Sequence, residues 1–118
     1  MRPDYHESKE FLTLLAPNTN QFVFQALAEK SVQSGNQRFY GTLEKCMPSL
    51  CKSNQKGAEI YMPLNVTNGH GRKKKNIIAA RALIADFDSV NKERSFNGYD
   101  LKPSCVVETS PGRHHAYW

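Results

Sequence analysis

The spacing of apolar and polar positions divides the chain into helical and extended segments. The helical segments are 4–17 and 43–57. In the first, Asp4 or Ser8 is the start signal and Pro17 is the stop. In the second, Pro48 is expected in the first helical turn and Gly57 just beyond the last one. Both helices present one apolar side and therefore should pack on a common core.

The remaining apolar positions alternate or run together, which is typical of strands. The extended segments are 21–30, 38–43, 58–66, 77–90 and the hairpin 104–118. Segment 21–30 should bury one face and pair with 38–43, the nearest strand along the chain. Pro63 suits an edge strand or a bulge, because it cannot donate to a ladder. Segment 77–90 is so apolar that we expect a strand covered on both faces.

In chain order these segments read α-β-β-α-β-β-β-β. This order predicts an α+β fold, a mostly antiparallel sheet with helices on one face and the other face open to carry a site. A length of 118 residues fits a single domain, 1–118. No apolar stretch is as long as a membrane span and no signal-peptide core follows Met1. We therefore expect no membrane partner and a cytoplasmic location.

The cationic residues are concentrated in one loop. The net charge is +5 and the pI is near 9.2. Arg72, Lys73, Lys74 and Lys75 form an unbroken basic run between glycine and asparagine residues. Such a run favours an anionic partner, with nucleic acid or nucleotide phosphates the commonest. An ordinary solvated loop remains the alternative.

Three cysteines fit reduced thiols better than a disulfide framework. Cys46, Cys51 and Cys105 are an odd number without the spacing of a small disulfide scaffold. Zinc is the competing interpretation, because four residues separate Cys46 from Cys51. No second close pair of cysteines completes such a site, so zinc is the weaker interpretation.

Two carboxylates end the apolar run ALIADFDSV. In a strand, Asp86 and Asp88 share one face, while Leu83, Ala85 and Phe87 share the face that should pack on the helices. Two neighbouring negative charges are costly unless a cation lies between them. Hard oxygen ligands at this spacing suit Mg²⁺ or Mn²⁺. The alternative is that the two acids only mark the end of a strand.

The hairpin that ends the chain carries a second polar cluster. Arg113, His115 and Tyr117 share one strand face, and the turn 110–112 could form a small anion-binding nest from backbone N–H groups. If this hairpin lies beside the Asp86 strand, the two clusters together suit a triphosphate and its metal ion. Pairing of Arg113 and His115 with ordinary surface acids such as Glu108 is the alternative.

The combination of ALIADFDSV with VVETSPGRHHAYW resembles the first two motifs of the archaeo-eukaryotic primase superfamily, and most closely the RepB-type primases of plasmids and phages. The likeness extends to the FLTLLAPN opening, to the N-x-x-G segment 54–57 that runs into IYMPLNVT, and to the NGHGR lead-in. It therefore covers most of the chain. The resemblance implies a primase-polymerase domain with an RRM-like core.

The resemblance also implies an activity: metal-dependent nucleotidyl transfer from NTPs or dNTPs that makes primers on a single-stranded DNA template. Asp86 and Asp88 match the metal-binding acids, and Mg²⁺ or Mn²⁺ is the implied cofactor. Together with His115 they are the candidate catalytic residues. The candidate phosphate-binding residues are Ser110, Gly112, Arg113 and His115. The candidate nucleic-acid-binding residues are Arg72, Lys73, Lys74, Lys75 and Arg81. A replicative helicase or an origin-binding protein would be the expected protein partner.

The third motif of the family, an acid on a later strand, is absent from this sequence, so we expect a partial primase domain. The main rival is a non-catalytic module that holds single-stranded nucleic acid on its open sheet face, with Phe and Tyr side chains stacking on bases. A metal-dependent nuclease or nickase is a third interpretation. The adjacent His114 and His115 count against the nickase, because neighbouring strand residues face opposite ways.

Overall fold

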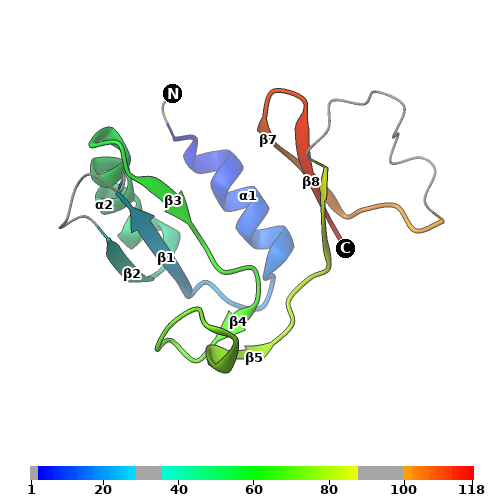
Figure 1. Ribbon diagram of the computed structural model, residues 1–118, viewed down its shortest axis with the longest axis horizontal. Coiled ribbons are helices and arrows are strands. Elements are labelled where there is room, and N and C mark those ends of the chain that lie inside the picture. The colour runs from blue at the N-terminus through cyan, green and yellow to red at the C-terminus, as the bar shows by residue number, and fades with distance from the viewer. Residues whose placement is uncertain (1–2, 29–35, 88–99) are drawn as a thin grey trace.

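The computed structural model describes residues 3–28, 36–87 and 100–118. Within these ranges, two α-helices and three small antiparallel sheets form an α+β fold (Figure 1). The helices are α1 (Tyr5–Leu15), α2 (Leu43–Gln55) and the short 3-10 helix η1 (Lys74–Asn76). The strands are β1 (Phe22–Leu27), β2 (Gln37–Gly41), β3 (Glu59–Tyr61), β4 (Val66–Thr67), β5 (Ile77–Ala79), β6 (Ile84–Phe87), β7 (Cys105–Ser110) and β8 (Arg113–Tyr117).

Side-chain caps define where both α-helices begin. The Asp4 carboxylate accepts hydrogen bonds from the backbone N–H groups of His6 (2.8 Å) and Glu7 (3.0 Å). Thr42 Oγ1 accepts from the N–H of Lys45 at 3.3 Å and caps α2 in the same way. Each cap satisfies N–H groups that have no partner inside the helix. The expected start at Asp4 is therefore confirmed.

The end of α2 follows the prediction, but its proline does not. Gly57 has φ +87°, the left-handed conformation that commonly ends a helix. Pro48, however, lies in the second turn of α2, because the helix already begins at Leu43. The prediction of a first-turn proline was wrong, since the apolar pattern alone did not reveal that Thr42 is the cap.

The main core lies between the sheet β2-β1-β3 and the two α-helices. β1 buries alternate residues, Phe22, Phe24 and Ala26, and both helices pack on this face of the sheet. The buried core residues are Leu12, Ala16, Phe22, Phe24, Leu43, Cys46 and Leu50. The predicted pairing of segments 21–30 and 38–43 is confirmed as the antiparallel pair β1–β2.

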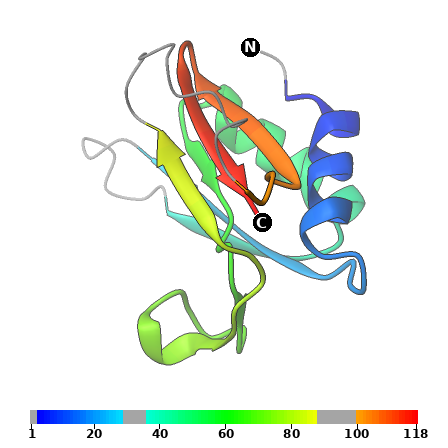
Figure 2. The same cartoon turned by 90° about the vertical axis from the view of Figure 1, so that its right-hand side faces the viewer.

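A separate hairpin, β4–β5, carries the basic run and projects from the rest of the molecule (Figure 2). Asn76 is its buried polar residue. Its carbonyl accepts from the N–H of Asn68 at 2.8 Å and its side-chain amide donates to Asn68 Oδ1 at 3.2 Å. These bonds satisfy polar groups of the buried Asn76, so they give the loop a defined conformation.

The third sheet has the order β6-β8-β7. The predicted hairpin of segment 104–118 is confirmed as β7–β8. Phe11 of α1 contacts Tyr117 of β8 edge-to-face, with ring centroids 5.2 Å apart. Helix α1 thus touches both larger sheets, and in Figure 1 it lies between them.

Two strand predictions were wrong. Segment 77–90 is not one strand covered on both faces: β5 and β6 are separate, and Ile78 and Leu83 are 66% and 73% exposed. Segment 58–66 is likewise divided: β3 ends at Tyr61, two residues before Pro63, and β4 begins at Val66. The expectation of one sheet therefore fails for the described residues, which form three. A long apolar run does not reveal where the chain leaves one sheet for another.

Candidate functional site

The strand adjacency that the two motifs required is present. β6 and β8 are antiparallel neighbours, and Asp86 lies directly opposite His115 in their register. Directly opposed residues project from the same face of a sheet. Tyr117 follows two residues after His115 and shares that face. Residues far apart in the sequence therefore form one cluster: Asp86, His115 and Tyr117.

His115 is the centre of this cluster. Its Nε2 lies 3.5 Å from Asp86 Oδ1, and its Nδ1 lies 3.2 Å from Tyr117 Oη. The side chain of Asp86 is 55% exposed, whereas that of His115 is 30% exposed. The imidazole is therefore held on both sides, while the carboxylate stays open to water.

Tyr117 attaches the cluster to α1 through Phe11. Burial raises the pKa of the Tyr117 hydroxyl, and the nearby Cys105 and Asp86 raise it further when they are negative. This hydroxyl is therefore a neutral partner for His115 at ordinary pH. We had expected the Asp86 face to be open and the helices to lie on the other face. That expectation was wrong at Tyr117, because α1 packs on this residue through Phe11. It was also wrong at Leu83, which was expected to pack on the helices but is exposed.

The turn between β7 and β8 is only partly suited to an anion. Gly112 has φ +78°, as a tight turn with glycine requires, and its N–H donates to Glu108 Oε1 at 3.1 Å. A carboxylate of the chain itself thus takes the donor that the nest would have offered to a phosphate. Ser110 and Arg113 are both exposed on either side of this turn.

Asp88, the second predicted metal ligand, lies outside the described residues. Among the residues that are described, no group of three or more His, Cys, Asp or Glu side chains could hold a metal ion. This also applies to Cys46 and Cys51 of α2, which are free thiols. Burial raises the pKa of the Cys46 thiol. Of the two predicted metal-binding acids, only Asp86 lies within the described residues.

His114 occupies the opposite face of β8 and lies across from Phe87. The two adjacent histidines therefore do not point to a common ligand position, as their adjacency in the sequence predicts.

The four consecutive basic side chains, Arg72, Lys73, Lys74 and Lys75, are exposed on the β4–β5 hairpin. Arg81 is different. Its guanidinium lies 5.8 Å from the centre of the Phe22 ring, its backbone N–H donates to Asn65 Oδ1 at 3.2 Å, and burial lowers its pKa. Arg81 therefore connects the β5–β6 segment to the core, and its contact with nucleic acid stays a prediction.

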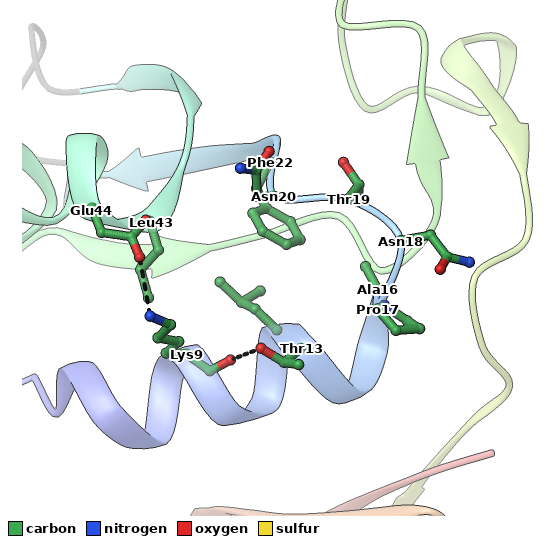
Figure 3. A pocket seen from close by; sticks show the side chains of 11 residues that line it. Lys9, Thr13, Ala16, Pro17, Asn18, Thr19, Asn20, Phe22, Leu43 and Glu44 are labelled. Carbon is green, nitrogen blue, oxygen red and sulfur yellow. Dashed lines mark hydrogen bonds and ion pairs between the residues drawn. The ribbon is translucent and has the colours of Figure 1, made fainter.

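A pocket of about 490 Å³ opens where α1, the following loop and the start of α2 meet. The Phe22 ring points into it, and Lys9 and Glu44 form an ion pair across its rim at 3.5 Å (Figure 3). Asn18 and Thr19 point away from its centre. The sequence does not reveal this pocket, because its lining comes from segments that only the fold brings together.

Two exposed tyrosines, Tyr40 of β2 and Tyr61 of β3, were not among the candidate residues by number. They are 51% and 45% exposed on the face of the first sheet that the helices leave uncovered. The signal was available in the alternation of β1, which puts Val23 and Gln25 on that face opposite the two tyrosines.

No family model, curated protein or solved structure matches this chain. None of the helices in the described ranges is long and apolar enough to cross a membrane.

Proposed function

We propose that this chain binds a nucleoside triphosphate together with Mg²⁺ or Mn²⁺ and forms part of a DNA primase-polymerase. The observation that supports the proposal best is the register of β6 and β8, in which Asp86 and His115 are direct neighbours. A metal-binding acid and a phosphate-binding histidine must lie this close together, because the metal and the histidine would contact oxygens of the same triphosphate.

The donor set fits a hard divalent cation. More than half of the Asp86 side chain is exposed, so an ion bound there could keep the water ligands that Mg²⁺ retains. Asp88 would supply the second carboxylate. In nucleotidyl transfer the bound ion would align the attacking oxygen and neutralise the charge that develops on the phosphates.

The residues of the chain have their own roles in this proposal. Tyr117 fixes the His115 ring, and the Nε2 side of the ring faces the position of the nucleotide beside Asp86. The exposed Arg113 adds positive charge at the other end of the same strand. The incoming phosphates would be oriented by these groups while the hydroxyl of the growing primer attacks and pyrophosphate leaves. A single-stranded DNA template, a cytoplasmic location and a helicase or origin-binding partner belong to the same proposal.

Calorimetric titration with a Mn²⁺–nucleoside triphosphate complex tests the site. We expect the wild-type chain to bind it and Asp86→Asn to bind at least about tenfold more weakly, because a carboxylate–metal contact is lost. Glu108→Gln is the matched control, since it removes one acid from the same sheet but still accepts from Gly112. Equal affinity in the wild type and in Asp86→Asn, or no metal-dependent binding at all, would refute the assignment.

Primer synthesis on single-stranded DNA tests the catalytic part of the proposal separately. Labelled products that depend on Asp86 would support a primase-polymerase. Nucleotide binding without products would instead favour the second candidate function, a non-catalytic nucleic-acid-binding module. The exposed run Arg72 to Lys75 on a projecting hairpin is the observation that favours this second candidate.

A further inference from the structure

The sheet β2-β1-β3 has one covered and one open face. Both α-helices pack on the side of Phe22, Phe24 and Ala26. On the other side, Tyr40 lies opposite Val23 and Tyr61 lies opposite Gln25 in the antiparallel registers. About half of each tyrosine side chain is accessible to water.

The two rings are placed on strands that flank β1. Two strand spacings separate β2 from β3, and the paired positions on β1 differ by two residues. Their Cα positions are therefore about 12 Å apart. Rings at this distance do not stack on each other, so each leaves a π-face for a different planar ligand group.

A cation lies beside Tyr40, whereas the hydroxyl of Tyr61 donates to the carboxylate of Glu59. Arg38 lies opposite Gln25, and its Nη1 donates to Tyr40 Oη at 3.3 Å. Tyr40 Oη in turn donates to the carbonyl of Gly69 at 2.7 Å, which ties the basic β4–β5 hairpin to this edge of the sheet. The charge of Arg72 acts on the hydroxyl of Tyr61 and opposes the larger effects that raise its pKa, the first of which is the hydrogen bond to Glu59.

We propose that the open face of β2-β1-β3 binds single-stranded nucleic acid, with Tyr40 and Tyr61 stacking on bases and Arg38 and the basic run 72–75 contacting phosphates. Stacking needs bases that are not paired, because a duplex hides their faces. Cations beside exposed aromatic rings are the combination that such sites use. The inference rests on the proposed function in one respect: the bound strand is taken to be the template of a primase.

An anionic lipid surface would also attract the basic run. The open face favours nucleic acid because its described side chains are mostly aromatic or polar, and because both tyrosine hydroxyls already have polar partners, Gly69 and Glu59. Binding to phosphatidylserine vesicles is therefore measured alongside binding to the oligonucleotide.

Fluorescence anisotropy with a labelled oligothymidylate of about 15 nucleotides, in EDTA and without nucleotide, measures the binding. Tyr61→Ala and Tyr40→Ala should each weaken it about 5- to 100-fold, the range found for stacked aromatic residues. Tyr61→Phe keeps the ring and should stay within about threefold of the wild type. Leu14→Ala, at an exposed position of α1, is the control and should change nothing.

The salt dependence tests the basic run with a matched set of charges. The triple variant Lys73→Ala/Lys74→Ala/Lys75→Ala should reduce the slope of log K against log salt by about 2, because each phosphate contact contributes about 0.7 for a single strand. The control Lys45→Ala/Lys52→Ala/Lys56→Ala removes three exposed charges from α2 and its C-terminal cap, and should leave the slope unchanged.

Ultraviolet cross-linking of the wild-type chain to a bromouridine-substituted strand avoids variants altogether. Adducts on the peptides that contain Tyr40 and Tyr61 are expected. Unchanged affinity in both alanine variants, adducts only elsewhere, or tyrosine-dependent binding to phosphatidylserine vesicles without oligonucleotide binding would overturn the inference. Because these titrations contain no metal and no nucleotide, their failure is distinct from a failure of the Asp86 site.

Discussion

The Asp86–His115 contact predicts which ring nitrogen of His115 carries the proton when the imidazole is neutral. A carboxylate only accepts hydrogen bonds, whereas a tyrosine hydroxyl can donate or accept. With Nε2 of His115 3.5 Å from Asp86 and Nδ1 3.2 Å from Tyr117, the neutral imidazole should carry its proton on Nε2. Replacing Asp86 with Asn removes this preference, because a side-chain amide can present either its carbonyl oxygen or its NH2 group to Nε2.

The size of the preference follows from the contact distance and the exposure. A well-formed hydrogen bond to a charged group contributes roughly 1.5–3 kcal/mol. At 3.5 Å from the half-exposed Asp86 carboxylate, a facing N–H is therefore stabilised by about 1 kcal/mol, and a facing lone pair is destabilised by a similar amount. The total of about 2 kcal/mol corresponds to about a 30-fold excess of the Nε2–H tautomer. In Asp86→Asn this excess should largely disappear, whereas Tyr117→Phe should change it less than about threefold.

Long-range ¹H–¹⁵N spectra distinguish the two tautomers by the shifts of the ring nitrogens. They should be recorded above about pH 8, where ordinary imidazoles are neutral. The exposed rings of His6 and His70 serve as internal references. A wild-type His115 that carries its proton mainly on Nδ1 would contradict the geometry, and so would an Asp86→Asn variant that keeps the full excess.

Two further predictions concern α2. Pro48→Ala restores the hydrogen bond from position 48 to the carbonyl of Glu44, so it should raise the free energy of unfolding in urea by about 1–3 kcal/mol. The neighbouring Ser49→Ala is the control and should change this free energy by less than about 0.5 kcal/mol. A Pro48→Ala variant less stable than the wild type would contradict the helix register. The pKa of Glu44 is lowered from 4.5 to about 2, first by the hydrogen bond from Tyr5, so its contribution to stability is complete above about pH 4.5 and is lost as pH falls toward 2. Glu44→Gln should flatten the rise of stability with pH in this window, and an unchanged slope would refute the Tyr5–Glu44 bond as its cause.

The sequence was sufficient to predict features that depend on neighbouring residues. The Asp4 cap of α1, the β1–β2 pair and the β7–β8 hairpin all follow from short-range patterns of apolar, turn and capping residues. The sequence put the terminal hairpin beside the Asp86 strand only as a condition, and the register of β6 and β8 meets that condition. The resemblance supplied the reason to expect them side by side, while the physical pattern alone left other pairings open.

The sequence was not sufficient where a choice between faces or sheets depended on distant residues. Nothing local in IIAARALIADF indicates that the chain leaves one sheet after Ala79 and enters another at Ile84. The break becomes understandable from Arg81, whose guanidinium lies over Phe22 and whose N–H bonds Asn65. Likewise, the position of Tyr117 against α1 depends on Phe11, almost the whole chain away.

The charges along segment 72–87 separate the two proposed sites. The segment begins with four consecutive cations on the β4–β5 hairpin and ends at Asp86 on β6, with Arg81 anchored to the core between them. A bare phosphate backbone would be attracted to the first end and repelled from the second. A triphosphate that carries a divalent cation can approach the carboxylate, because the ion reverses the sign of the interaction. The same continuous segment would therefore direct a bare template strand to the basic end, whereas a triphosphate is accepted beside Asp86 only together with its divalent cation.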